Sequence, residues 1–262
     1  MTYSIVARDP ETGQLGVAVQ SRAFGTGAVC PWAIPGVGAA TTQSFTEIGY
    51  APRGLELMAA GRSPQEALDE LVAADEGRDF RQVAYVAADG ATAAWTGEAC
   101  IEACGQLSRE NVSAQGNMLA SADVWPAMVE AFETTAGPLA VRLLAALDAA
   151  EVAGGDARGR QAGGILVVSG DRDDPPWRRV VDVRVDDHPE PVQELRRLYV
   201  LSDAYGRRRE LSPDEARAAG LREDEVELID AVRTGRIDAW IGGHAGRAAT
   251  IDRLRRLGMI PA

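Results

Sequence analysis

The sequence contains no lysine, because all 27 of its basic residues are arginine. Chemistry that needs a lysine side chain is therefore excluded: the P-loop of nucleotide hydrolases, the Schiff base of pyridoxal-phosphate enzymes and the strand lysine of kinases. Only two histidines, His188 and His244, are present. With so few histidines and no Gly-x-Ser-x-Gly motif, the sequence gives little support to a histidine-containing catalytic triad.

Cysteine, long apolar runs and positive charge are also scarce. The three cysteines are an odd number, which argues against a disulfide framework. No run approaches the ~18 consecutive apolar residues of a membrane span, and the net charge of −12 repels phosphate backbones and anionic lipid. We therefore expect neither a nucleic-acid partner nor a membrane partner. The chain opens without the features of a signal peptide, so we expect a cytoplasmic location.

The order of the predicted elements favours an α+β fold. Two β-prone runs, 3–9 and 15–20, flank a turn with Pro10 and Gly13 and predict a hairpin near the start of the chain. Further strands are predicted at 36–42, 82–88, 92–96, 164–169 and 180–185, with another ending at Asn117. Helices are predicted at 52–60, from Ser63 through Val72, and at 122–134, 138–152 and 192–202. Strand pairs thus alternate with helix pairs, which indicates layered antiparallel sheets and not a doubly wound parallel sheet.

The composition shifts near residue 205. Beyond it the chain is rich in arginine and acidic residues, and it contains a capping-box signature from Ser212 to Glu215. Short helices are predicted there, two of them at 224–234 and 247–257. We therefore predict a main domain over residues 1–204 and a small helical C-terminal subdomain over 205–262.

The second residue carries the most informative chemistry. Initiator methionine is ordinarily removed when the next residue is as small as threonine, which would leave Thr2 with a free α-amine. An α-amine with a pKa of about 7.8 is roughly one-third neutral at pH 7.5. It can therefore accept the proton of its own hydroxyl, a known way to activate a nucleophile. The alternative is that Thr2 is an ordinary terminus, because any protein that starts with Met-Thr acquires one.

After Thr2 the chain passes at once into the predicted hairpin, and here the sequence resembles the N-terminal-nucleophile hydrolases. It resembles more closely the domain of unknown function 1028 family, which is placed in that superfamily. The matching segments are 2–9, 16–22, 31–32, 36–39, 97–100, 115–118, 154–161 and 185–189. The resemblance implies a four-layer αββα sandwich of two antiparallel sheets. For catalytic members of the superfamily it also implies amide hydrolysis through an acyl-enzyme on the N-terminal residue.

Four polar residues at predicted strand ends are candidates to surround Thr2: Ser21, Arg22, Gln43 and Asn117. Amide side chains there could donate to a developing oxyanion, an effect of ~3 kcal/mol per donor in characterised enzymes. The lysine that tunes the nucleophile in proteasome-type subunits has no counterpart here. Arg22 offers fixed positive charge but cannot shuttle a proton. The alternative for each residue is a satisfied polar group in a loop or at a sheet edge.

A glycine-rich run at 154–161 supplies candidate substrate contacts: Asp156, Arg158, Arg160 and Gln161. Arginine forks match carboxylates and an aspartate can hold an ammonium group, which would suit an amino-acid-like amide. The alternative is a helix-to-strand connection with an internal Asp–Arg pair. The run from Asp186 to His188 contains residue types that bind metals, but a solvated strand end is the favoured interpretation. We predict no metal and no cofactor.

Three functional hypotheses follow. The first is an amidohydrolase that cleaves a small-molecule C–N bond with Thr2 as nucleophile and its α-amine as general base. The second is a non-catalytic protein on the same fold that binds a small molecule or a cell-wall fragment. The C-terminal tail would contribute, because it resembles a short version of the region assigned to peptidoglycan binding in family members. The third is a role in assembly, since sheets of this type pack readily into dimers, and we expect a homodimer.

Overall fold

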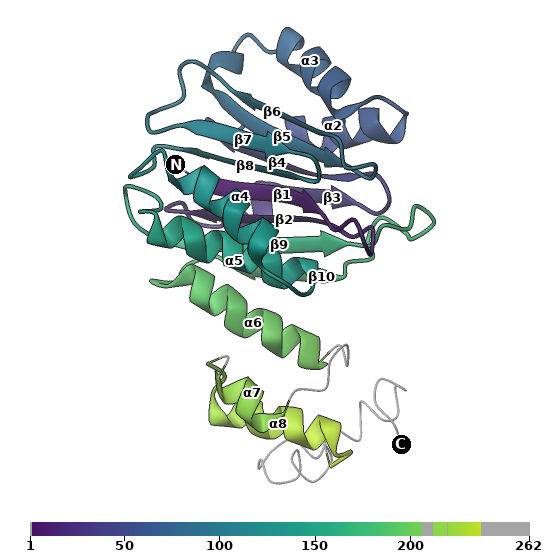
Figure 1. Ribbon diagram of the computed structural model, residues 1–262, viewed down its shortest axis with the longest axis vertical. Coiled ribbons are helices and arrows are strands. Elements are labelled where there is room, and N and C mark those ends of the chain that lie inside the picture. Colours follow the sequence, from purple (N-terminus) through teal and green to yellow (C-terminus); the bar gives the residue numbers. More distant parts are fainter. Residues whose placement is uncertain (1, 206–211, 219, 237–262) are drawn as a thin grey trace. The chain divides into compact units, whose positions relative to one another are not determined.

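The computed structural model describes residues 2–205, 212–218 and 220–236 (Figure 1). The chain divides into two compact units, Met1–Leu195 and Arg196–Ala262. None of the described helices is both long enough and apolar enough to span a membrane. The helix predicted at 247–257 lies outside the described residues.

The first unit contains two antiparallel sheets. Sheet A has the strand order β10-β9-β2-β1-β8-β7, and sheet B has the order β3-β4-β5-β6. The strands of sheet A are β1 (Thr2–Arg8), β2 (Leu15–Ser21), β7 (Gly105–Arg109), β8 (Val112–Asn117), β9 (Ala162–Val168) and β10 (Val181–Val185). Those of sheet B are β3 (Pro31–Ile34), β4 (Gly38–Ser44), β5 (Arg81–Ala87) and β6 (Thr92–Thr96).

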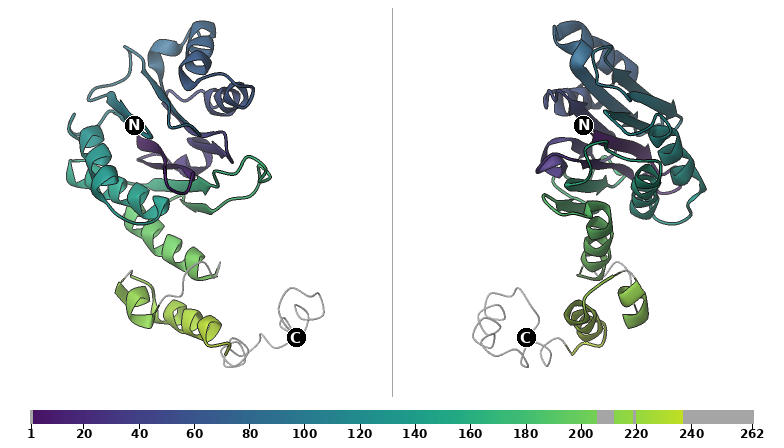
Figure 2. Two further views of the ribbon diagram at one scale, coloured as in Figure 1. Left: turned by 45° about the vertical axis from the view of Figure 1, so that its right-hand side comes forward. Right: turned by 90° about the vertical axis from the view of Figure 1, so that its left-hand side faces the viewer.

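Helices cover the outer face of each sheet (Figure 2). Sheet B packs against α2 (Tyr50–Ala59) and α3 (Pro64–Ala74), and sheet A packs against α4 (Val124–Thr134) and α5 (Leu139–Val152). Between the sheets the core is made of small and branched side chains, among them Val6, Ala39 and Val86. Side chains of this size allow the two inner faces to approach closely. The predicted four-layer αββα sandwich is confirmed.

Local signals placed several elements correctly. The predicted first hairpin is β1 and β2, and its turn is held by Asp9, whose carboxylate accepts hydrogen bonds from the backbone N–H of Glu11 and the hydroxyl of Thr12. Helix α3 begins with the predicted capping box, in which Ser63 and Glu66 each accept a hydrogen bond from the other's backbone N–H. Both devices satisfy backbone groups that would otherwise lack partners.

Four elements of the first unit were not predicted. They are the strands β3 and β7, which lie at sheet edges, the short helix α1 (Thr26–Val29) and the 3₁₀ helix η1 (Arg78–Phe80). Strand β7 has the sequence Gly-Gln-Leu-Ser-Arg and is only partly buried. It therefore lacks the apolar alternation that identifies a strand from sequence.

The second unit contains α7 (Pro213–Ala218) and α8 (Glu223–Arg233). The predicted capping box is present at the start of α7, where the backbone N–H of Ser212 donates to Glu215 and the backbone N–H of Glu215 donates to Ser212. A small apolar cluster of Ala216, Leu221 and Val226 packs with partly buried side chains of α6 (Pro191–Tyr205). Helix α6 corresponds to the helix predicted at 192–202 and extends three residues further at its C-terminal end.

Candidate active site

The strand register brings Thr2 together with polar residues from both sheets. Strand β1 lies between β2 and β8, and Thr2 pairs with Ser21 at the end of β2 and with Asn117 at the end of β8. In sheet B, Gln43 of β4 pairs with Gln82 of β5. We call these five residues the Thr2 cluster. The cluster gathers three of the four polar residues predicted to surround Thr2.

Direct hydrogen bonds hold the cluster together. The Thr2 hydroxyl donates to the Ser21 hydroxyl over 3.0 Å. The Gln43 side-chain amide donates to the backbone carbonyl of Thr2 over 3.3 Å and to Gln82 Oε1 over 2.7 Å. Asn117 Nδ2 donates to the same Gln82 oxygen over 2.9 Å. Thr2 is only 5% exposed. Its hydroxyl therefore lies in a buried polar environment at the end of the sandwich where β1 begins.

A second layer of hydrogen bonds orients the Gln43 amide. The Ser4 hydroxyl donates to Gln43 Oε1 over 2.6 Å and accepts from Gln115 Nε2 over 2.7 Å. Thr41 also donates to Ser4, over 3.3 Å. Because the oxygen of Gln43 is engaged by Ser4, its NH₂ group faces Thr2. Buried networks of this kind are rigid when each member has a partner.

Sequence reasoning missed Gln82, which joins the two sheets. Its oxygen accepts from the two cluster amides, and its Nε2 lies 2.8 Å from the carbonyl of Gly116 in β8 and 2.9 Å from the hydroxyl of Thr96 in β6. Gln82 is completely buried. The available signal was a glutamine at the start of an apolar strand, because buried polar side chains need hydrogen-bond partners.

Arg22 takes a different position from the cluster. Its guanidinium lies at the surface, where Nη1 donates to Gln161 Oε1 over 3.2 Å. Its backbone N–H donates to Asp156 over 2.9 Å. Arg22 therefore connects the end of β2 to the glycine-rich loop through its backbone, and its charge is directed to the predicted substrate residue Gln161.

The glycine-rich loop runs past the ends of the strands of sheet A at which Thr2 lies. Asp156 binds the Arg22 backbone beyond β2, and the backbone N–H of Ala157 donates to the carbonyl of Met118 beyond β8 over 3.3 Å. Because β2 and β8 flank β1, residues 155–157 link the strand ends on both sides of Thr2. The Asp156 carboxylate also pairs with the guanidinium of Arg158.

A cavity of about 340 Å³ lies beside this loop and is lined by Glu151, Gly154, Asp156, Gly159, Arg160 and Pro189. Arg160 pairs with Glu151 and Glu190, and the Tyr3 hydroxyl donates to Glu151. Burial, together with the Glu151 charge, raises the pKa of Tyr3 well above its usual value. Tyr3 follows Thr2 on β1, so its side chain lies on the opposite, helix-covered face of sheet A. Of the predicted substrate residues, Asp156 and Arg160 line the cavity.

The segment with metal-binding residue types forms ordinary contacts at a strand end. Asp187 accepts a hydrogen bond from the Gln161 amide over 3.0 Å, and His188 Nδ1 accepts from the backbone N–H of Glu190 over 3.0 Å. Within residues 2–205, 212–218 and 220–236, no three His, Cys, Asp or Glu side chains gather as a metal site would require.

Comparisons with known proteins identify the family. Residues 2–195 match the model of a family described as of unknown function, DUF1028. The crystal structure of a DUF1028 protein from Silicibacter pomeroyi matches with a TM-score of 0.69 and 32% identity, covering 77% of this chain and 89% of that one. Anbu, an ancestral β-subunit from Yersinia bercovieri, matches with a TM-score of 0.37 and 11% identity, covering 79% and 97%. None of the curated proteins matches the chain. The chain belongs to the DUF1028 family.

Proposed function

We propose that this protein hydrolyses a small-molecule amide and that the hydroxyl of Thr2 is the nucleophile once Met1 has been removed. The observation that carries the proposal is the fixed position of this hydroxyl, 3.0 Å from Ser21 at an edge that also gathers two side-chain amides. The same residue supplies the base, because a terminal amine titrates close to neutral pH.

The reaction runs in two stages. In the first, Thr2 Oγ1 attacks the carbonyl carbon of the substrate and its proton passes to the α-amine. The C–N bond then breaks as the amine returns this proton to the departing nitrogen, which leaves an ester on Thr2. In the second stage, the α-amine takes a proton from water, the resulting hydroxide attacks the ester carbonyl, and the acid leaves as Thr2 Oγ1 regains its proton.

The neighbouring residues take separate parts. Asn117 carries a second side-chain N–H besides the one donated to Gln82, so we assign it as the donor to the oxyanion. Gln43 holds the Thr2 carbonyl and is a positioning residue. Ser21 fixes the rotamer of Thr2 through the hydroxyl contact.

We assign the substrate contacts to the glycine-rich loop. Its residues 155–157 link the strand ends that flank Thr2, and the same loop carries Asp156 and Arg160. Arg158 and Gln161 extend the polar surface next to it. A substrate with both an ammonium and a carboxylate group would match the charges of both signs found there. An amino-acid-like amide therefore fits the amine side of the scissile bond.

The first prediction tests the nucleophile on untagged protein. Mass spectrometry should show a chain that begins at Thr2, and a library of small amides should contain a substrate. Thr2→Ala should lower kcat/KM by roughly 10³-fold or more, since the attacking oxygen is gone. Thr2→Ser, which keeps a hydroxyl, is the matched control and should retain measurable activity. A tag fused before Thr2 should abolish activity. A retained Met1, or full activity in Thr2→Ala, would contradict the proposal.

A non-catalytic binding role is the second candidate, favoured by the 340 Å³ cavity, which is lined by charged residues on the other face of sheet A. It predicts that amino acids raise the melting temperature and that this effect survives Thr2→Ala, because a ligand that binds only the folded state stabilises it.

A homodimer and a cytoplasmic location are also part of the proposal. Light scattering of the full chain tests the first of these, and cell fractionation tests the second.

A further inference from the structure

Large apolar side chains are exposed on the loops around Thr2. Five of them follow or precede the strand ends at that edge, and we call them the apolar rim: Phe24, Phe45, Ile48, Phe80 and Ile101. Phe24 is 73% exposed, Phe45 is 59% exposed and Phe80 is 47% exposed. Exposed apolar residues that gather in one region mark a binding surface more often than singly scattered ones do.

The apolar rim adjoins the amides of the Thr2 cluster. Phe45 lies two residues after Gln43 and Phe80 lies two residues before Gln82, so each Cα pair is at most roughly 7 Å apart. On the other side, the carbonyl of Ile101 accepts a hydrogen bond over 2.7 Å from the backbone N–H of Met118, the residue after Asn117. The polar cluster is therefore buried, and Phe45, Phe80 and Ile101 are exposed on segments next to its residues.

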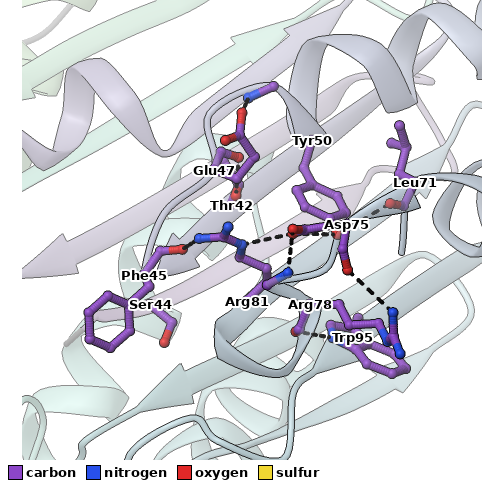
Figure 3. A network of polar contacts seen from close by, with 12 residues as sticks. Thr42, Ser44, Phe45, Glu47, Tyr50, Leu71, Asp75, Arg78, Arg81 and Trp95 are labelled. Atoms are coloured by element: carbon purple, nitrogen blue, oxygen red, sulfur yellow. Dashed lines mark hydrogen bonds and ion pairs between the residues drawn. The ribbon is translucent and has the colours of Figure 1, made fainter. Parts of the chain in front are cut away.

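Two rings of the rim pack against each other, and hydrogen bonds tie together the backbone segments that carry them. Phe45 and Phe80 pack edge to face with centroids 5.6 Å apart, and the backbone N–H of Phe45 donates to the carbonyl of Phe80 over 3.2 Å. Arg81 fixes this arrangement, because its Nη1 donates to the Phe45 carbonyl over 2.6 Å while its Nε binds Asp75 over 2.8 Å (Figure 3). A ring ordered before binding loses little entropy when a ligand arrives.

Charges of both signs lie near the rings. The Asp75 carboxylate is paired with Arg81, whose guanidinium also binds the Phe45 carbonyl. Glu47 and Asp79 are exposed close to the rings along the chain, and so is Arg78. Because neither sign of charge prevails, a neutral apolar group is the matching ligand for the rings themselves.

We propose that Phe45 and Phe80 bind the acyl side of the scissile amide and that this acyl group is aromatic or branched aliphatic. The inference rests on the proposed role of Thr2. Phe45 follows the end of β4 and Phe80 precedes the start of β5, the two strands of sheet B that carry Gln43 and Gln82. The charged glycine-rich loop, in contrast, contacts the strand ends of sheet A. The two sides of the substrate thus meet surfaces of different chemistry, apolar for the acyl group and charged for the amine.

The second prediction compares two substrates that share one amine, a phenylacetyl amide and an acetyl amide. Phe45→Ala and Phe80→Ala should each raise KM for the phenylacetyl amide about tenfold with kcat little changed, because ring contacts of this kind are worth about one decade in affinity. KM for the acetyl amide should stay the same. Trp177→Ala is the matched control, since Trp177 is 78% exposed on the connection between β9 and β10 at the opposite edge.

The failure of this inference can be told from the failure of the proposed function. Thr2-dependent hydrolysis with no change in either KM, or with equal changes in both, overturns the inference alone. If no amide is cleaved, the proposed function fails, and calorimetry with phenylacetamide decides the inference. Binding that weakens about tenfold in Phe45→Ala supports the apolar subsite, and absence of binding overturns it. A change in oligomeric state in Phe45→Ala with an unchanged KM would show an interface between copies and would also overturn it.

Discussion

At the scale of single residues, Asp75 and Arg81 stabilise the loop that carries Phe45. The hydrogen bond from Arg81 lowers the pKa of Asp75 below its ordinary value. Because the carboxyl group binds its proton less tightly in the folded than in the unfolded chain, its contribution to stability is present above the ordinary aspartate pKa. It is lost as the pH falls through the lowered pKa of the folded state.

The third prediction follows from this loss of stability at low pH. Asp75→Asn should lower the free energy of unfolding at pH 7 by less than about 1 kcal/mol, as is usual for a pair near the surface. The difference from the unmodified protein should shrink as the pH is lowered from 5 towards 2. Urea unfolding at several pH values measures it. Glu70→Gln, which removes an exposed carboxylate from α3, is the control. The prediction would be contradicted if the difference in free energy of unfolding between the unmodified protein and Asp75→Asn stayed constant with pH.

Residues of the site differed in how far the sequence revealed them. Ser21 and Asn117 were found because each ends a strand with a recognisable pattern. Gln82 was not, because its partners come from β4, β6 and β8. A hydrogen bond between two sheets depends on how they face each other, and no local pattern encodes that arrangement.

At the scale of elements, helix α2 meets sheet B through a glycine. A Cβ atom at Gly54 would lie 2.4 to 2.5 Å from ring atoms and the hydroxyl of Tyr85. The Tyr85 ring is fully buried and its hydroxyl donates to the Tyr50 carbonyl over 2.7 Å. Neither the helix nor the ring can move away without breaking this contact.

The fourth prediction concerns Gly54→Ala. In a free helix this change would stabilise by about 1 kcal/mol, but overpacking of a filled core costs about 1 to 3 kcal/mol or more. The net effect should be destabilisation, measured by chemical denaturation. The same change in a Tyr85→Leu background should cost less, because the ring is gone. Equal costs in both backgrounds would contradict the steric explanation.

The elements that were predicted correctly share a local cause. Caps, tight turns and amphipathic periods depend on residues close in the chain, which is why α3 and the first hairpin were placed well. Strand β3 has only four residues and β7 is mostly polar. Their pairing comes from the neighbouring strand of the sheet, so their own residues carry little signal.

At the scale of the whole molecule, the first unit contains both sheets and a core of its own. The match to the family ends at the same residue, 195, as this unit. The layer order was predictable, since strand pairs alternate with helix pairs and the family resemblance pointed the same way. The strand order was not, because β1 pairs with a strand more than a hundred residues away.

The fifth prediction is that a chain shortened to end at Tyr205 keeps the sandwich. Its free energy of unfolding should lie within about 1 kcal/mol of the free energy of unfolding of the first unit in the full chain. The reason is that the core of this unit is complete within its own residues. Tryptophan fluorescence in urea measures this for both chains. A shortened chain that fails to fold would contradict it.

The central place of β1 in sheet A has a consequence for the living cell. The second neighbour of β1, strand β8, begins about 110 residues after it, which at ~5–20 residues per second takes roughly 5 to 20 s of synthesis. During that interval the first strand is paired on one side at most and its amino end is open to an aminopeptidase. The removal of Met1 that the proposed function requires can therefore take place on the nascent chain, before Thr2 is buried in the finished fold.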